Sequence, residues 1–434
     1  MVSPPSDGKV SRRLVSLFPL LLLSLLLVFG GFWFFRPRLP ASIEVAGHSM
    51  LPTLWGSSLE MPCQDCGYPL RCSWPVDADT ILCPNCGYDE NLASSATERE
   101  PDRVQLTPLT EESPLARWNL VAVQLPGESQ YAVKRVVGLP GESIRIEGGE
   151  LLVDDLLLEK SWHLFQQLRV EVHDLDFRPA SQLRRPASPD DGPSIWKPLH
   201  QPSGWTSSYP FHFQPLEGGR WDHLVLERRP AIPGLVTPPD QPLRGIVDYH
   251  PANQGLARPR LHPVRDVMVE VEVDASSPAG FTLEIQRGHT SYRAILDLQH
   301  DQVELHVGSD IVARHDLPRS QGGRWKIGLA IFDGQLVLAS DAGIHQVPAA
   351  MEDKGQELLT IMVGARVAGL KIDRLRVWRD IHWLGPDLTD EPWSPGKKLG
   401  QDEYFLLGDN TAVSEDSRQW RSPIRRQDIL GTIR

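Results

Sequence analysis

The chain has 434 residues, of which 41% are hydrophobic and 23% charged, and its formal net charge is −12. This length predicts two or three domains, and the hydrophobic fraction is typical of a folded protein. The acidic charge argues against nucleic acid as a partner, because phosphate contacts require lysine and arginine. Proline, with 38 residues, is concentrated between positions 179 and 263. This favours turns and edge-bounded β-structure over long helices.

A long apolar segment lies near the N-terminus. Residues 14–35 carry no charge, and at about 1.5 Å per residue they can cross the roughly 30 Å hydrocarbon core of a bilayer. Basic residues flank the segment at positions 9, 12, 13, 36 and 38. This bias predicts that residues 1–13 are cytoplasmic and that the rest of the chain lies on the outer side of the cell membrane. A cleaved secretory signal is the alternative, but its apolar region is usually shorter.

A candidate nucleophile follows the apolar segment. Residues 42–45 predict a short strand that leads into the string Gly47-His48-Ser49-Met50-Leu51-Pro52-Thr53. Glycine allows a tight turn and a close approach of a substrate strand, and proline fixes the exit from the turn. We expect Met50 to be buried beside the bond that is cut. Ser49 needs an adjacent base to act as a nucleophile, and without one the string would be a surface turn.

A lysine in apolar surroundings is the candidate base. Residues 120–125 and 131–137 predict two strands, and Lys134 stands between Val133 and the pair Val136-Val137. Apolar surroundings disfavour the charged amine and lower its pKa, so that the neutral amine can accept a proton from Ser49. A solvated lysine paired with an acid is the alternative. Residues 144–147 and 151–154 predict a hairpin around Gly148-Gly149.

A third segment, residues 404–418, supplies polar groups for the same candidate site. An apolar strand at residues 404–407 ends in Gly408-Asp409-Asn410, and Ser414-Glu415-Asp416-Ser417-Arg418 follows. A last strand is predicted at 428–433. In their order along the chain and in their residues, the three segments resemble the sequence motifs of type I signal peptidases. These are the membrane-bound Ser–Lys proteases that remove signal peptides. The resemblance covers about residues 14–56, 117–158 and 402–433.

The resemblance implies a role for each matching residue. Ser49 would be the nucleophile and Lys134 the general base. The supporting roles fall on Ser414, which would hydrogen-bond the lysine amine, on an ion pair of Asp416 with Arg418, and on Asp409. No cofactor is implied for catalysis, and the partners would be the lipid bilayer and preproteins that carry signal peptides. Gly47 stands where some members have serine, so the oxyanion would depend on backbone N–H groups, including that of Ser49.

Two readings compete with a signal peptidase. A self-cleaving Ser–Lys repressor is disfavoured by the apolar segment and by the lack of a DNA-binding domain. A non-catalytic, membrane-anchored binding protein with a decayed peptidase core is disfavoured because Ser49, Lys134, Ser414 and Asp416 are all present. Residues 117–119 and Glu142 differ from the residues that the family usually has at these positions. These differences do not involve Ser49 or Lys134.

A cysteine cluster interrupts the peptidase segments at residues 57–115. Cys63 and Cys66, like Cys83 and Cys86, form a C-x-x-C pair followed by Gly-Tyr. This spacing is typical of a zinc ribbon, whose four sulfur ligands leave no open position, so the metal would be structural. Disulfides, favoured outside the cytoplasm, and free thiols remain alternatives. Cys72 is predicted to be spare, and residues 93–112 to be a polar connector.

A second insertion separates the hairpin from the closing box. Residues 159–261 predict irregular structure, whereas 262–382 contain regularly alternating strands that predict an antiparallel β-sandwich. The run 323–337 resembles laminin-G/concanavalin-like jelly rolls. Such a module could be an inert spacer or could bind a glycan or a protein. Residues 383–399 would lead back to the peptidase domain.

The expected fold class is therefore mainly β. A signal-peptidase-type antiparallel catalytic domain, made of residues 36–56, 116–158 and 400–434, would have one N-terminal transmembrane helix. A zinc-ribbon-like module and a β-sandwich would be inserted into it.

Overall fold

The computed structural model describes residues 42–73, 79–110, 113–124, 131–178, 194–206, 209–228, 232, 245–254, 260–275, 280–317, 323–349, 359–366, 370–420 and 423–434. The predicted anchor at residues 14–35 lies outside them. In these described ranges, no helix has both the length and the apolar character needed to cross a bilayer. Residues 43–434 form one compact unit.

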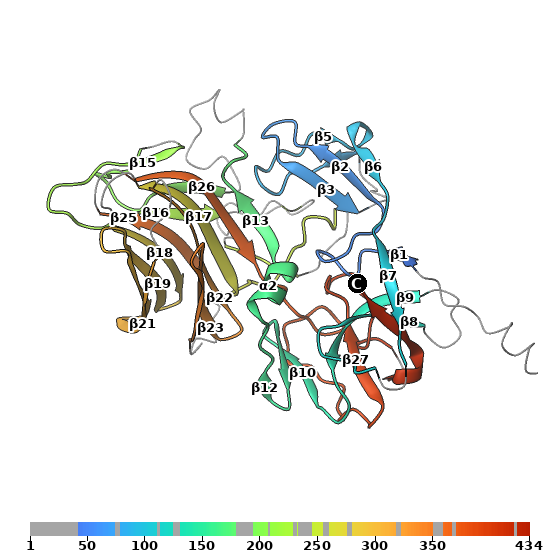
Figure 1. The fold of residues 1–434 in the computed structure, drawn as a ribbon. Coiled ribbons are helices and arrows are strands. Elements are labelled where there is room, and N and C mark those ends of the chain that lie inside the picture. The colour runs from blue at the N-terminus through green and yellow to red at the C-terminus, as the bar shows by residue number, and fades with distance from the viewer. Residues whose placement is uncertain are drawn as a thin grey trace, which may run out of the picture. The chain divides into compact units, whose positions relative to one another are not determined.

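The strands before Ser49, around Lys134 and before Asp409 lie in one seven-stranded sheet (Figure 1). Its order is β1 (Ser42–Glu44), β7 (Arg103–Pro108), β29 (Ile429–Ile433), β8 (Leu120–Gln124), β9 (Tyr131–Gly138), β27 (Glu403–Leu407) and β28 (Ile424–Arg425). The pairing of β27 with β9 places Leu406 opposite Val136, although the large insertion separates them in sequence. The sheet therefore brings the lysine strand and the closing segment side by side.

Strand β7 corrects one expectation. It lies in the stretch 93–112, which was predicted to be a connector, but it pairs with β29 at the C-terminus. Its residues alternate, with Val104 and Leu106 buried and their neighbours exposed. A three-residue strand, β6 (Thr97–Arg99), precedes it and pairs with β2 (Ser58–Pro62). Polar composition concealed these strands because only one face of β7 is covered and all three residues of β6 are exposed.

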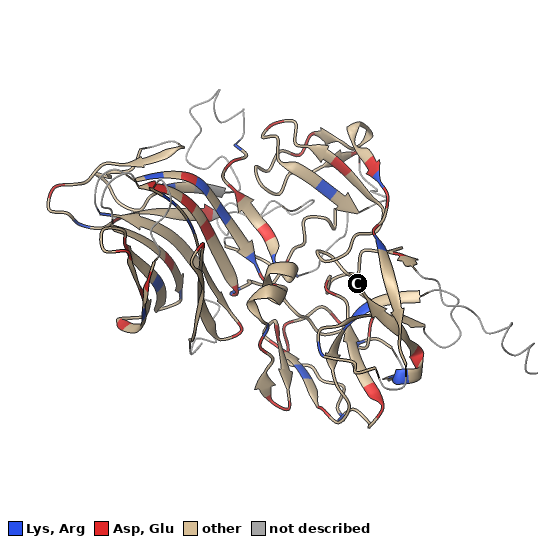
Figure 2. Cartoon of the chain, in the orientation of Figure 1, with Lys and Arg blue, Asp and Glu red and all other residues tan. Residues whose placement is uncertain are grey.

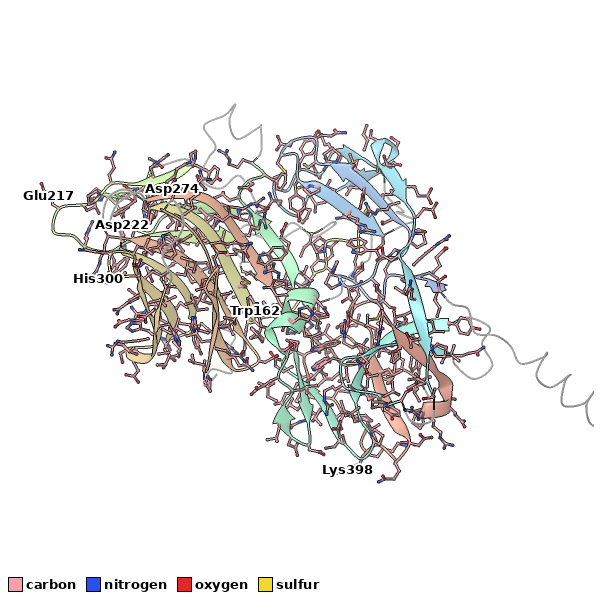
Figure 3. The ribbon with its side chains drawn as sticks, viewed as in Figure 1. Trp162, Glu217, Asp222, Asp274, His300 and Lys398 are labelled. Atoms are coloured by element: carbon pink, nitrogen blue, oxygen red, sulfur yellow. The ribbon has the colours of Figure 1, made fainter. Side chains whose placement is uncertain are left out.

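The predicted hairpin consists of β10 (Ile144–Glu147) and β11 (Glu150–Val153), and β12 (Leu156–Leu157) extends it. A helix that the sequence reading missed follows, α2 (Trp162–Leu168). The side chain of Ser161 caps this helix by accepting the N–H of Leu164. Trp162, labelled in Figure 3, stacks against Phe165 with ring centroids 5.6 Å apart. Aromatic packing thus holds this short helix in place.

The large insertion is a β-sandwich of two seven-stranded sheets. One sheet contains β13 (Val170–Asp174), β26 (Leu370–Arg379), β17 (Val267–Ala275), β22 (Arg324–Phe332), β23 (Gln335–Ser340) and β24 (Gly343–Pro348), and β15 (Phe211–Phe213) pairs with β26. The other contains β14 (Ser194–Pro198), β16 (Asp222–Arg228), β25 (Leu359–Ala365), β18 (Gly280–Arg287), β19 (Thr290–Asp297), β20 (Gln302–Val307) and β21 (Asp310–Asp316).

The sandwich takes in more of the chain than residues 262–382. Strands β13 to β16 come from the stretch 159–261, which was predicted to be irregular, and they pair within both sheets. Inward residues of both sheets share one core, with Val269 and Leu329 from one sheet and Leu283 and Val363 from the other. Burying such a side chain contributes about 1.5–3 kcal/mol. On β17 and β26, basic and acidic residues lie on neighbouring strands (Figure 2), and Arg376 is 3.7 Å from Glu270.

Candidate active site

The turn that carries Ser49 is held by its apolar neighbours. Met50 and Leu51 are 1% and 0% exposed, and the Leu54 N–H donates to the Met50 carbonyl at 2.9 Å. Ser49 itself is half-buried. The predicted burial of Met50 is therefore observed, and the buried side chains of Met50 and Leu51 hold the serine turn in place.

Lys134 lies on β9 and reaches the serine. Its Nζ is 2.9 Å from the Oγ of Ser49, within hydrogen-bond distance. The residue is 4% exposed, and Val121 of β8 stands opposite it in the sheet. A neutral amine at this position can accept the serine proton directly. The structure thus brings together the two residues singled out as nucleophile and base.

Burial lowers the pKa of Lys134 to about 8. Desolvation is the largest cause, since it disfavours the ammonium form. The carboxylate of Asp416 acts in the opposite direction and the guanidinium of Arg418 again lowers this pKa. A fraction of Lys134 is therefore neutral near pH 7, which is what a general base requires.

Asp416 and Arg418 form the expected ion pair. The Arg418 Nε donates to Asp416 at 2.8 Å, and the two side chains are 1% and 0% exposed. The other carboxylate oxygen accepts the Gly408 N–H at 3.0 Å, and Arg418 also donates to the carbonyls of Leu384 and Ser414. With its donors and acceptors paired, this buried ion pair fixes the loop between β27 and Ser414.

Asp409 has a partner that the sequence analysis missed. Arg135, the residue after Lys134, donates to both Asp409 oxygens at 2.7 Å from Nε and Nη2. The side chains are 2% and 0% exposed, and Thr53 donates its hydroxyl to the same carboxylate at 2.5 Å. The pair links the serine turn, β9 and the closing segment. The sequence signal for it is an arginine directly after Lys134, together with Thr53 at the end of the serine string.

Ser414 is close to the site but lacks the expected bond. Its Oγ is buried and has no hydrogen-bond partner among the described residues, so the hydrogen bond predicted from Ser414 to the Lys134 amine is not observed. A Cβ on Gly408 would lie 2.1 Å from this Oγ and 2.6 Å from the Ser49 carbonyl oxygen. Glycine at 408 is therefore what allows the serine turn and Ser414 to approach each other.

An asparagine of the large insertion also reaches the serine turn. Asn253 and Asn410 exchange two amide hydrogen bonds, of 3.0 and 2.8 Å, and both residues are 3% exposed. Asn410 in turn donates its backbone N–H to the Ser49 carbonyl at 2.9 Å and its side-chain amide to the His48 carbonyl at 3.0 Å. Sequence reasoning missed Asn253 because it lies in a proline-rich stretch 204 positions from Ser49.

Replacing Asn253 by leucine is expected to lower kcat by about 10- to 100-fold with little change in KM. The substitution removes both hydrogen bonds between Asn253 and the buried Asn410 amide, and a small displacement of a nucleophile has a cost of this order. Steady-state cleavage of a peptide substrate measures both constants. Asn253→Asp keeps the acceptor for Asn410 and should recover part of the rate. Equal kcat in all three proteins would show that the contact does not position Ser49.

The space beside Gly47 is open. A Cβ added there would meet nothing within 4 Å, whereas a Cβ on Gly56 would lie 2.8 Å from the Gly47 carbonyl oxygen. The turn therefore approaches Gly56 closely and leaves Gly47 facing free space. No side chain at position 47 can donate to an oxyanion, which leaves backbone N–H groups to do so.

The four predicted cysteine ligands form one cluster. Cys63 Sγ is 3.7 Å from Cys86 Sγ, and Cys66 Sγ is 3.8 Å from Cys83 Sγ. All five cysteines, each within the described ranges, are free thiols, so the disulfide alternative is not observed. Sulfurs bound to zinc at about 2.3 Å in a tetrahedron lie about 3.8 Å apart. The four ligand atoms all lie within 4.8 Å of one another, so the cluster is consistent with a structural zinc site.

Both cysteine pairs have the same backbone geometry. The Gly67 N–H donates to the Cys63 carbonyl and the Gly87 N–H to the Cys83 carbonyl, both at 2.9 Å. Gly67 and Gly87 have φ of 76° and 77°, a conformation that favours glycine. Strands β3 (Pro69–Ser73), β4 (Thr80–Ile81) and β5 (Asn91–Leu92) flank the pairs. The same turn in both pairs explains why the C-x-x-C-G-Y motif occurs twice.

A comparison with protein families identifies the peptidase segments. The family model described as "Signal peptidase, peptidase S26" matches residues 14–183 and 384–434. These two ranges cover slightly more than half of the chain, and the gap between them contains most of the sandwich. No curated protein matches the chain.

Solved structures match this chain at low similarity. Carbohydrate-binding module CBM66 from Bacillus subtilis matches with a TM-score of 0.24 and 9% identity, covering 43% of this chain and 92% of that one. Galectin LEC-6 from Caenorhabditis elegans matches with a TM-score of 0.22 and 10% identity, covering 26% and 83%. The VIP36 exoplasmic/lumenal domain matches with a TM-score of 0.29 and 9% identity, covering 48% and 92%. At such scores the matches carry no argument about binding.

Proposed function

This chain belongs to the signal peptidase family, peptidase S26, and from this premise we propose that it is a membrane-anchored serine endopeptidase that cleaves signal peptides from exported preproteins. Ser49 is the nucleophile and Lys134 the general base. The observation that supports this most strongly is the 2.9 Å separation of the two reactive atoms, together with the burial of Lys134.

The first half of the reaction makes an acyl-enzyme. The neutral amine of Lys134 accepts the proton of the Ser49 hydroxyl as Oγ attacks the scissile carbonyl carbon. Backbone N–H groups beside Gly47 stabilise the oxyanion of the tetrahedral intermediate. When the intermediate collapses, the peptide C–N bond breaks and the ammonium of Lys134 returns its proton to the leaving amine. The mature protein departs, and the signal peptide remains as an ester on Ser49.

The second half releases the signal peptide. Lys134, again neutral, accepts a proton from a water molecule that attacks the ester carbon. Collapse of the second tetrahedral intermediate breaks the bond to Ser49, which recovers the proton from Lys134. Lysine therefore acts as base and acid in turn, and Asp416 and Arg418 contribute by setting its pKa.

Cleavage is expected to depend on pH through Lys134. Because the neutral amine is the base and its pKa is about 8, kcat/KM should rise about tenfold per pH unit below 8 and level off above it. Asp416→Asn removes a charge that raises this pKa, so the inflection should move to lower pH. A profile measured on a soluble preprotein tests this. An unshifted inflection in the Asn variant, or a flat wild-type profile, would contradict the role of Lys134.

The anchor explains why this activity suits signal peptides. We place the transmembrane helix at residues 14–35 with a cytoplasmic N-terminus, so that Ser49, fourteen positions after Phe35, lies close to the outer surface of the bilayer. A signal peptide spans the same bilayer and presents its cleavage site at that surface. We further propose that the four cysteines hold a structural zinc ion, and that the β-sandwich could bind a glycan or a protein ligand.

A further inference from the structure

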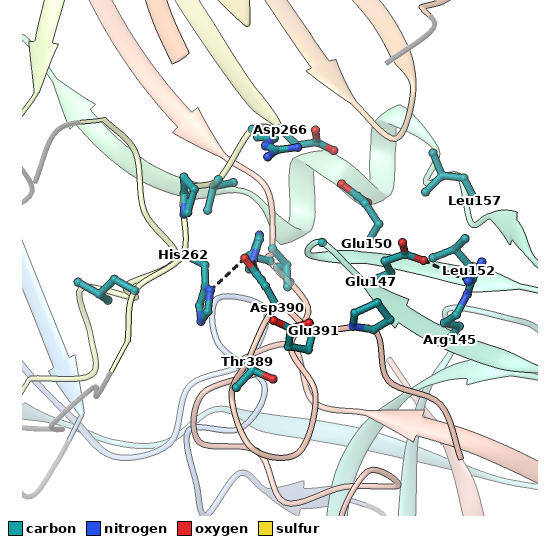
Figure 4. A pocket seen from close by; sticks show the side chains of 18 of the residues that line it. Arg145, Glu147, Glu150, Leu152, Leu157, His262, Asp266, Thr389, Asp390 and Glu391 are labelled. Carbon is teal, nitrogen blue, oxygen red and sulfur yellow. Dashed lines mark hydrogen bonds and ion pairs between the residues drawn. The ribbon is translucent and has the colours of Figure 1, made fainter. Parts of the chain in front are cut away.

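A large cavity lies away from the Ser49–Lys134 pair. It has a volume of about 860 Å³, and Figure 4 shows side chains of the hairpin β10–β11, the segment before β17 and the return segment around Asp390 facing it. Two histidines and a carboxylate, His262, His382 and Asp390, line one side. None of these three residues was singled out in the sequence, because 120 positions separate the two histidines.

Both histidines face one carboxylate. His262 Nδ1 is 2.9 Å from one oxygen of Asp390, and His382 Nε2 is 2.6 Å from the other. The two rings are stacked, with centroids 5.8 Å apart. The histidine side chains are 10% and 6% exposed, whereas Asp390 is 35% exposed. Three donor atoms thus converge, within 4.8 Å of one another, at the wall of an open cavity.

The hydrogen bonding of His262 leaves its Nδ1 available to a cation. Its Nε2 is 3.1 Å from the Leu388 carbonyl, which can only accept, so Nε2 must carry a proton. Nδ1 faces a carboxylate oxygen of Asp390, and without a metal it carries a proton that it donates to this oxygen. A metal ion can take the place of that proton, because both atoms then present lone pairs to it. A histidine that ligates a metal commonly donates its other N–H to a backbone carbonyl in this way.

His382 is fixed by the hairpin. A Cβ on Gly149 would lie 2.2 Å from the His382 ring, and Gly149 has a φ of 88°. The Trp383 N–H donates to the Gly149 carbonyl at 2.9 Å. The His382 ring therefore packs directly on Gly149. Besides allowing the hairpin turn, this glycine leaves the space that the ring occupies. A preset ring orientation is a property of metal sites.

We propose that His262, His382 and Asp390 bind a divalent transition metal ion, with zinc the best match to two imidazoles and one carboxylate. Donors bound to zinc at about 2.0–2.1 Å lie roughly 3.4 Å apart. The two contacts between the histidine nitrogens and the Asp390 oxygens must therefore lengthen by less than about 1 Å when zinc binds. The fourth position faces the cavity and is available to water or to an anionic ligand. The cavity is lined by four arginines and five carboxylates, so both signs of charge lie near that position.

Metal analysis of the full-length protein in detergent tests this site. After dialysis with zinc, the wild-type protein is expected to hold two equivalents, one on the four cysteines and one here. His382→Ala and Asp390→Asn should each hold one. His300→Ala is the matched control, since that exposed histidine also faces a carboxylate, Asp297, at 2.8 Å but lacks the other ligands; it should hold two.

Cobalt distinguishes the two sites by spectrum. Thiolate ligands give intense charge-transfer absorption, which the His–His–Asp site cannot produce. Zinc is first loaded on both sites and then removed from the His–His–Asp site, and cobalt is added in its place. The protein should then give a weak visible spectrum. His382→Ala should lose this spectrum and Cys72→Ala should keep it. Circular dichroism verifies that each variant is folded. A wild-type protein whose zinc content equals that of His382→Ala and Asp390→Asn would overturn the proposal. Because the readout is metal content, it does not depend on peptidase activity.

Discussion

Ser49→Ala and Lys134→Ala are each expected to reduce kcat for preprotein cleavage by roughly 10⁴- to 10⁶-fold, the range seen when a nucleophile or its base is removed. In the proposed mechanism, the alanine at 49 removes the atom that would form the acyl-enzyme. The alanine at 134 removes the amine that would take the serine proton, 2.9 Å away. Because the two residues act as a unit, the double variant should be hardly slower than either single variant. Mass analysis of the mature product measures the rate.

Matched controls separate loss of chemistry from loss of fold. Lys398→Ala removes a lysine, labelled in Figure 3, that is 69% exposed and whose Nζ is 3.3 Å from Asp154. Ser143→Ala removes a hydroxyl that donates to the same aspartate at 2.9 Å. Both controls should cleave at the wild-type rate. Cleavage at that rate by either Ser49→Ala or Lys134→Ala would refute the catalytic pair.

Asp409→Ala is expected to lower the free energy of unfolding by about 3–5 kcal/mol, because it leaves the buried Arg135 guanidinium without its carboxylate. The pair is bidentate at 2.7 Å, and both side chains are at most 2% exposed. Denaturant unfolding of the full-length protein measures the loss. The double variant Arg135→Met/Asp409→Leu should recover most of it, since two apolar residues leave no unpaired charge.

The surface supplies the control for this prediction. Arg103 and Glu44 form an ion pair of 3.2 Å, with side chains 73% and 53% exposed, so Glu44→Ala should cost no more than about 1 kcal/mol. A loss at Asp409 as small as the loss at Glu44 would mean that the buried pair is not what holds the serine turn to β9 and β27.

The peptidase strands could be predicted because their alternation and apolar runs are local. Strand β9 shows where this reasoning ends. Alternation places Lys134 and Arg135 on opposite faces, so one of them should be solvated, yet residues 133–138 are all buried. Segments distant in sequence cover both faces of this strand. Arg135 was therefore missed as the partner of Asp409.

The sandwich was predicted only where its strands are long. Strand β17 (Val267–Ala275) alternates over nine residues, whereas β15 (Phe211–Phe213) has three and lies among prolines. Short strands gain their stability from pairing with partners such as β26, which the local sequence does not reveal. The same holds for Asn253 and for the His262–Asp390–His382 cluster, whose members meet only through the fold.

An acid quench during the first turnover tests the central claim most directly. Acid protonates Lys134 and stops deacylation, so that the ester survives digestion and mass mapping. The account predicts that the fragment containing Ser49 gains the mass of the signal-peptide acyl group, and that this adduct is missing in Lys134→Ala. An adduct on another residue, or one that forms on Ser49 equally fast without Lys134, would contradict it.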